Sequence, residues 1–257
     1  MNTVAVSVPS PSSNAANVYL LEAKYEFLRV LRTPAFAAPT LLFPPLFYLL
    51  FGLLLNHGNA GAAKYLFASY SVFGVMAPAL FGFGVGLAME RERGWLALKR
   101  VMPMPPGAYL FAKMAMAMLF ALIIYVVLAL MAFFLGGVRL EIDQWLLLGV
   151  IAALGAIPFS AIGMMIGSKA NASASPAFVN LIYLPMAFLS GLWMPLTMLP
   201  SFFTQIAPLW PSYHLAQLGQ MTIGTQPWAD VGTHLTWLVG FTVVCFAIAR
   251  RWLAKAA

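Results

Sequence analysis

The residues with the clearest chemical potential lie together in one short stretch of the sequence, MERERGWLALKRVMPMPP, at positions 89–106. Six charged residues fall between Glu90 and Arg100, in a chain with only 14 basic and 7 acidic residues. Such charges can pair with opposite charges on a partner, while Trp95 and Leu98 can fill an apolar cleft. The prolines that follow predict the end of a helix of about two turns. The stretch is a candidate docking element, and an ordinary charged loop is the alternative.

Other reactive side chains are sparse in this sequence. His57, His214 and His234 are scattered, form no H-E-x-x-H pair and have no multi-cysteine cluster near them, because Cys245 is the single cysteine. Metal ligands normally come as groups of such side chains. The sequence therefore predicts no metal site and no catalytic residue.

The composition indicates an integral membrane protein, with 62% hydrophobic and only 8% charged residues. Crossing the hydrocarbon core takes about 20 apolar residues. Six segments qualify, and no strand-like alternation is present, so we expect an all-α protein with six transmembrane helices. The expected spans are 35–55, 66–89, 108–135, 145–167, 177–199 and 232–249 within a transmembrane domain over 34–252.

The distribution of basic residues predicts the orientation in the membrane. Twelve of the 14 lysines and arginines fall on one predicted side, and only Lys64 and Arg139 fall on the other. Both termini and the charged stretch are therefore expected in the cytoplasm. The net charge of +7 follows membrane topology, because the basic residues flank apolar runs, and nucleic acid is not an expected partner.

The segments outside the spans give further expectations. Residues 1–17 lack the charge and apolar run of a signal peptide and are expected to be a disordered tail, and residues 253–257 are expected to be a cytoplasmic tail. Residues 18–33 predict an interfacial amphipathic helix, with Leu20, Leu21, Phe27, Leu28 and Leu31 on one face and Glu22, Glu26 and Arg29 on the other.

The energy source is constrained by what the sequence lacks. No acidic residue lies inside an expected span, and Lys113 is near enough to a span end to reach the interface, so ion coupling is disfavoured. No G-x-x-x-x-G-K-[ST] loop is present. ATP, if it powers the protein, must be bound by another chain.

Two sets of residues resemble one known family. The first set follows the pattern E-R-E-x-G-T-L, with a later proline, in the first cytoplasmic loop of the permease subunits of type-2 ATP-binding-cassette (ABC-2) exporters. Trp95 stands where that family usually has threonine. The second set resembles the end of span 5 and the external segment that follows. The matching residues are Glu90, Arg91, Glu92, Gly94, Leu96 and Pro103 in the first set, and Ser190, Gly191, Pro195, Leu199, Pro200, Gln205, Pro211 and Tyr213 in the second.

The resemblance implies that residues 90–105 form a cytoplasmic coupling helix, which receives motion from a separate ATPase subunit that binds ATP and Mg²⁺. Two permease chains, identical or related, and two ATPase chains would make the exporter. Residues 200–228 would form short external or re-entrant helices. The coupling residues so identified are Glu90, Arg91, Glu92, Arg93, Gly94, Trp95 and Leu98, and the external-gate residues are Pro195, Pro200, Gln205, Pro211 and Tyr213.

The same resemblance places a substrate path between spans 2 and 5 of the two protomers. A path of this composition would suit a hydrophobic or amphipathic substrate such as a drug, an antibiotic or a lipid. The protein is then expected in a bacterial inner membrane, surrounded by lipid. The candidate path residues are Phe73, Met76, Asn180, Tyr183, Met186 and Phe188.

Two alternatives from other classes remain open at this point. A six-span intramembrane serine protease would use Ser190, before Gly191, as nucleophile and His234 as base. Such enzymes typically carry G-x-S-G, whereas this chain reads AFLSG and lacks the first glycine. A non-transporting membrane scaffold would recruit a cytoplasmic partner through residues 90–105.

Overall fold

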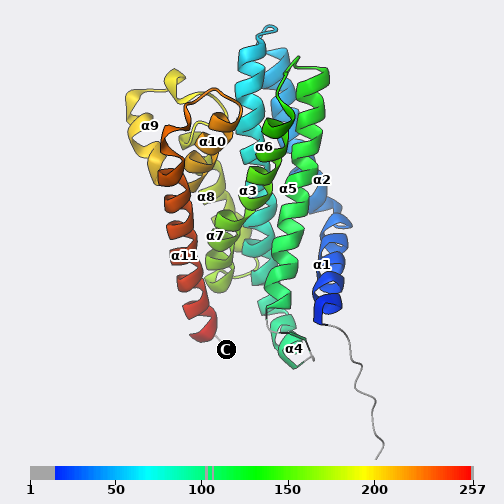
Figure 1. The fold of residues 1–257 in the computed structure, drawn as a ribbon. Helices are drawn as coiled ribbons and strands as arrows, with labels where there is room; N and C mark the ends of the chain where they lie inside the picture. Colours follow the sequence, from blue (N-terminus) through cyan, green and yellow to red (C-terminus); the bar gives the residue numbers. More distant parts are fainter. Residues whose placement is uncertain (1–14, 102–103, 106, 256–257) are drawn as a thin grey trace, which may run out of the picture.

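The computed structural model describes residues 15–101, 104–105 and 107–255. Within these residues all regular secondary structure is helical (Figure 1). Most of the expected tail over 1–17 lies outside them, as do Pro103 and residues 256–257. The first helix begins at Ala15, and the last continues to Lys255.

The helices follow one another with short connections. The N-terminal half contains α1 (Ala15–Leu31), α2 (Pro34–Phe47), the π-helix η1 (Tyr48–Leu54), α3 (Ala60–Glu92), α4 (Trp95–Val101) and α5 (Ala108–Phe134). The C-terminal half contains α6 (Ile142–Leu154), α7 (Ala156–Lys169), α8 (Ser175–Leu189), η2 (Leu196–Met198), α9 (Ser201–Ile206), η3 (Ala207–Leu209), α10 (Pro211–Thr222), η4 (Trp228–Asp230) and α11 (Val231–Lys255).

Five helical segments among the described residues are long and apolar enough to cross a membrane. They cover the first four and the sixth of the expected spans. Their bounds are Pro34–Leu54, Ala60–Glu92, Ala108–Phe134, Ile142–Lys169 and Trp228–Leu253.

The remaining apolar helix is shorter than the sequence predicts. Over the expected span 177–199, α8 contains 15 residues and ends at Leu189. Gly191 then takes a left-handed backbone conformation with φ of 74°, and Pro195 precedes the short η2 helix. Since a full crossing takes about 20 helical residues, hydropathy placed the helix end about ten residues too late.

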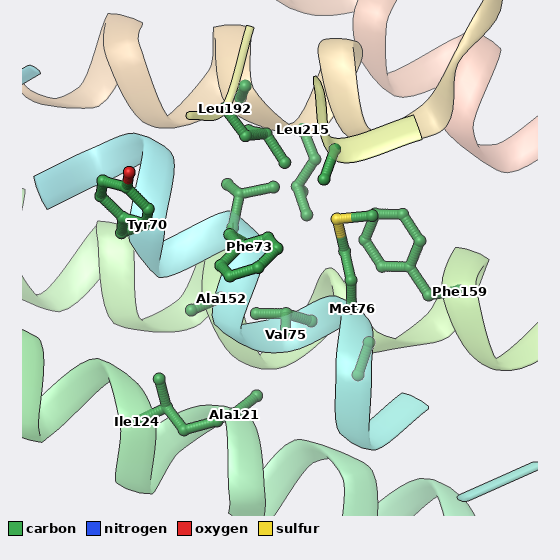
Figure 2. Packing of buried hydrophobic residues seen from close by; sticks show 14 of the residues in the cluster. Tyr70, Phe73, Val75, Met76, Ala121, Ile124, Ala152, Phe159, Leu192 and Leu215 are labelled. Carbon is green, nitrogen blue, oxygen red and sulfur yellow. The ribbon is translucent and has the colours of Figure 1, made fainter. Parts of the chain in front are cut away.

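The core of the bundle is built around α3. In the region shown in Figure 2, Phe73 and Met76 of α3 lie among Ile124 of α5, Phe159 of α7 and Leu215 of α10. These side chains are nearly fully buried. A 33-residue helix that is enclosed on most sides can position groups at both of its ends.

Close contact between α3 and α7 depends on Gly163 and Gly167, a four-residue spacing of small residues that permits close helix approach. A Cβ atom on Gly167 would lie 2.6 Å from the carbonyl oxygen of Phe83, and one on Gly163 would lie 2.8 Å from that of Leu80. Any side chain would push the two helices apart. The glycines therefore let the backbones touch and fix the position of α3 against α7.

Helix α1 lies lengthwise against the first part of α5 (Figure 1). Tyr19 contacts Phe111 and Phe27 contacts Phe120, each with ring centroids 5.4 Å apart. A step of eight residues on α1 thus matches a step of nine on α5. The two helices run side by side in the same direction over this stretch.

The face of α1 that packs on the bundle is mixed, because it carries the buried Glu26 as well as Phe27. Leu20 and Leu21 are 64% and 50% exposed, whereas Glu26 on the opposite face is only 6% exposed. Leu20 and Leu21 are free to contact lipid, and the buried carboxylate needs partners inside the bundle.

Figure 1 places the start of α1, helix α4 and the C-terminal end of α11 at one end of the bundle. Helix α9 lies near the other end. The end that carries α4 is called the charged end below, because it holds Glu26, Glu90, Arg91 and Lys113.

Candidate functional site

The charged stretch forms the end of α3, a turn and a separate short helix. Helix α3 continues through Glu92, and Gly94 then reverses the chain with φ of 73°. The seven residues of α4 follow, about two turns. The turn needs a residue that accepts a left-handed conformation, which glycine does without steric cost.

Glu90 lies inside the bundle in a group of buried charges. Its Oε1 atom accepts hydrogen bonds from Lys113 Nζ at 3.1 Å and from Arg29 Nη2 at 2.6 Å. Its Oε2 atom accepts one from the Tyr109 hydroxyl at 2.6 Å. Glu26 Oε1 binds the same two basic groups, at 2.9 Å from Lys113 Nζ and 2.6 Å from Arg29 Nη2.

Two carboxylates and two basic groups in this cluster balance in charge. Lys113 is only 1% exposed, so the expectation that it reaches the membrane interface is wrong. Burial alone would lower the pKa of Arg29, but Glu26 and Glu90 outweigh burial and raise it. A buried charge is tolerated only when it is paired and hydrogen-bonded, and this cluster joins α1, α3 and α5 in that way.

Arg91 and Glu92 fasten the end of α3 to the connection between α7 and α8. Arg91 donates hydrogen bonds to the carbonyl oxygens of Gly167 at 3.1 Å, Ser168, and Ala170 at 2.7 Å. Glu92 Oε1 accepts a hydrogen bond from the backbone N–H of Ala172 at 2.7 Å. Both residues thus hold neighbouring backbone in place.

The other four predicted coupling residues form an exposed surface on the turn and α4. Trp95 is 41% and Leu98 is 60% exposed, and the Arg93 guanidinium lies 5.4 Å from the Trp95 ring centroid. Behind them, Lys99 forms an ion pair with Glu22 of α1. Arg93, Gly94, Trp95 and Leu98 are called the α4 surface below.

The predicted path residues divide between a cavity and the core. Asn180 and Tyr183 of α8 line a cavity of about 310 Å³ between α2, α3 and α8. Phe73 stacks against Tyr183 with centroids 5.3 Å apart. Met76 and Met186 are fully buried and do not line this cavity, and Phe188 contacts Phe203 of α9 at 5.8 Å.

Sequence reasoning missed the α2 side of this cavity. Phe36, Thr40 and Phe43 line it from α2, and Phe81 lines it from α3. The spacing of three and four residues on α2 puts its three side chains on one helical face. That periodicity is a signal the sequence does contain, although it does not identify the neighbouring helix.

A second cavity of about 470 Å³ adjoins the first toward the charged end. Phe36 and Phe81 line both cavities. At its other end the second cavity is lined by Glu26, Arg29 and Glu90 of the charge cluster, together with Arg93 and Trp95 of the α4 surface. The two cavities therefore lead from a charged region to an apolar one.

The predicted gate residues lie on the short helices after α8. Pro195 precedes η2, Pro200 precedes α9, Gln205 lies on α9, and Pro211 starts α10 before Tyr213. Helix α10 enters the bundle and is largely buried. Its Gln220 donates to the Tyr65 carbonyl oxygen and the Ser69 hydroxyl, both at 3.0 Å.

Ser190 and His234 have different partners. Ser190 Oγ donates to the Met186 carbonyl oxygen at 2.6 Å and shares a hydrogen bond with the Ser212 hydroxyl. His234 Nδ1 is hydrogen-bonded to His214 Nδ1 at 2.8 Å. A nucleophilic serine needs a base within hydrogen-bond reach, and Ser190 is held by a hydroxyl and a carbonyl instead.

Known proteins resemble this chain over most of its length. Residues 50–251 match the family described as "ABC-2 family transporter protein". The chain is 28% identical over 241 residues to YvfS of Bacillus subtilis (strain 168), whose name describes a transport permease, covering 91% of this chain and 98% of YvfS. It is 35% identical over 109 residues, 42% of each chain, to nodulation protein J of Rhizobium leguminosarum bv. viciae.

Proposed function

Since the chain belongs to the ABC-2 transporter family and is a permease subunit, we propose that it forms the membrane half of an exporter driven by a separate ATPase chain. This chain would supply the translocation path and hydrolyse nothing itself. ATP and Mg²⁺ would be bound by the partner, because the sequence has no phosphate-binding loop.

The observation that carries the proposal is the α4 surface. An exposed tryptophan beside an arginine is typical of an interface anchor, and both side chains project from a helix end that is firmly held. Glu90 is fixed by buried ion pairs, and Arg91 and Glu92 bind the connection after α7. A force applied at Trp95 would therefore move α3 and its neighbours together. The coupling contact would be made by the α4 surface, with residues 90–92 transmitting the movement.

The expected assembly has two permease chains and two ATPase chains in a bacterial inner membrane. The six-span arrangement would have both termini and α4 in the cytoplasm, with α8 and the turns after it as the fifth crossing. Two observations support this arrangement. The start of α1, helix α4 and the end of α11 lie together at the charged end (Figure 1), and most basic residues fall on the predicted cytoplasmic side.

The substrate would be hydrophobic or amphipathic and would move from the cytoplasmic side through the two adjoining cavities. The charged end of the 470 Å³ cavity would receive a polar group of the substrate. The apolar 310 Å³ cavity beside Asn180 and Tyr183 would receive the hydrophobic part of the substrate. Phe36 and Phe81, shared by both cavities, would separate the two regions.

The test is co-purification from mild detergent with an ABC ATPase encoded in the same cell. Trp95→Ala/Leu98→Ala should release the ATPase while leaving the permease folded, as judged by gel filtration. The matched control is Trp228→Ala/Leu209→Ala, which removes a tryptophan and a leucine that are somewhat more exposed and lie on the short helices beside α9 and α11. Retention of the ATPase by the first variant would refute the proposed contact. If the first variant releases the ATPase and cells still move the substrate as before, the contact recruits the ATPase without driving transport, and this result would favour a scaffold.

A further inference from the structure

One face of α11 forms a groove along the outside of the bundle. Only 17% of the residues in the most apolar part of this span are buried, against 78% for α3. In its upper part the groove is a cavity of about 500 Å³ between α6, α7, α10 and α11. Its lining is apolar apart from Thr242.

The break between α6 and α7 shapes this groove. A Cβ atom on Gly155 would lie 2.4 Å from Leu215 Cδ2, so glycine lets α10 approach the break closely. Gly155, Pro158 and Leu215 all line the cavity. The wall opposite α11 is therefore shaped by the packing of a leucine side chain of α10 directly on the backbone of the break.

Toward the charged end the groove opens into a surface hollow of about 480 Å³ that is lined by α11 residues alone. Thr242 and Val243 line both the cavity and the hollow, and Arg250 and Arg251 line the far end of the hollow. Steps of three and four residues from Leu235 through Thr242 to Arg250 keep these positions on one helical face. The distance along the helix from Leu235 to Arg250 is about 22 Å, more than one leaflet of the roughly 30 Å hydrocarbon core.

We propose that this face of α11 binds an anionic phospholipid, with an acyl chain along the groove and the phosphate group on Arg250 and Arg251. In the part of the chain that the structure describes, neither arginine has an acidic partner. Guanidinium groups bind phosphate oxygens in a fork geometry, and basic residues at the cytoplasmic end of membrane helices are typical lipid headgroup sites.

A second copy of the chain fits this face less well. A symmetric dimer contact through parallel α11 helices would place each arginine pair next to the same pair of its partner. Like charges at such close quarters repel. A lipid phosphate, in contrast, supplies the negative charge that this end of the groove lacks.

The test is native mass spectrometry of the full-length protein in detergent, titrated separately with phosphatidylglycerol and phosphatidylcholine. Wild type should retain phosphatidylglycerol preferentially. Arg250→Gln/Arg251→Gln should weaken its binding about thirtyfold. The matched control, Lys24→Gln/Arg32→Gln, removes two exposed basic residues of the N-terminal region and should change binding little.

The acyl-chain groove is tested without changing charge. Val239→Trp fills the groove at a position that is 62% exposed and should also weaken phosphatidylglycerol binding, whereas Val126→Trp on α5, where the valine is 51% exposed, should not. Equal affinity for both lipids, or equal losses in the two double glutamine variants, would overturn the proposal. Efficient crosslinking of a Val239→Cys variant to itself in membranes would also overturn it, in favour of a second copy.

Discussion

Lys113 Nζ on α5 lies 2.9 Å from Glu26 Oε1 on α1, although 87 positions separate the two residues. The same ammonium group binds Glu90 at the end of α3. This single buried lysine therefore ties the N-terminal helix to the element that leads into the α4 surface. A movement of α4 would be passed to α1 through these ion pairs, because pulling them apart would leave a buried charge without a partner.

Replacing the buried lysine should destabilise the protein. Lys113→Met leaves two buried carboxylates with one partly exposed arginine, which should lower the free energy of unfolding by about 3 kcal/mol. Thermal unfolding in detergent measures the change. Glu26→Gln/Lys113→Met should recover part of the loss, because it removes one charge of each sign. Equal unfolding midpoints for Lys113→Met and an exposed control, Lys24→Met, would show that the cluster contributes little.

Adding one carbon at the α3–α7 contact should also be costly. Gly167→Ala places a Cβ atom 2.6 Å from the Phe83 carbonyl oxygen, which can be relieved only by moving a backbone. The expected loss is about 1–3 kcal/mol of unfolding free energy. Gly240→Ala on α11 is the control, since nothing lies within 4 Å of its added carbon. Similar thermal stability of the two variants would contradict the close packing.

Much of the helical fold could be predicted from hydropathy, because a membrane span is a local property of the sequence. The end of α8 could not. Residues 190–199 are apolar enough to continue a helix, but Gly191 adopts a left-handed conformation and Ser190 binds Ser212. Hydropathy measures transfer into lipid and carries no information on these backbone and side-chain contacts.

The charge cluster was missed for a related reason. Hydropathy assigns Glu26 to a solvated face and Lys113 to a span end, since each residue alone is expensive to bury. Their pairing across 87 positions is invisible to a local pattern. The exposed tryptophan and leucine of α4, by contrast, could be recognised, because they lie within one short motif.

Acidification below neutrality should weaken the packing of α10 on α11. The Pro208 carbonyl oxygen can only accept, so His214 Nε2 donates to it at 2.8 Å and His214 Nδ1 accepts from His234 Nδ1. Burial lowers the pKa of His214 below its ordinary value of 6.5. The unfolded chain therefore takes up a proton first, and stability falls as the pH drops below about 6.5.

Thermal unfolding at pH 7.5 and pH 5.5 measures this dependence. His214→Gln should show a smaller difference between the two pH values than wild type, while His57→Gln, at an exposed turn, should keep the wild-type difference. An unchanged pH dependence in His214→Gln would exclude this histidine as its source.

Reversing the charge of Glu92 should uncouple transport. Glu92→Arg loses the hydrogen bond to the Ala172 N–H and adds a positive charge next to Arg91 and Arg93. Expression should remain intact, since Glu92 forms no buried ion pair with any residue that the structure describes. ATP-dependent substrate movement should fall several-fold relative to Asp143→Arg, an exposed acidic residue of α6 that serves as control. Unchanged transport would argue against a role for Glu92 at this junction.

Filling the apolar cavity should block the substrate path without affecting assembly. Asn180 lines the cavity from an exposed position on α8, so Asn180→Trp adds bulk to the path while the core remains unchanged. Cells that express the complex should become about as sensitive to hydrophobic toxic compounds as cells without it, although the ATPase still co-purifies. Leu181→Trp, at a neighbouring residue that is 70% exposed and does not line the cavity, is the control. If both variants protect cells equally well, the substrate must pass elsewhere. The cavity between α2, α3 and α8 would then be a gap in the packing with no role in transport.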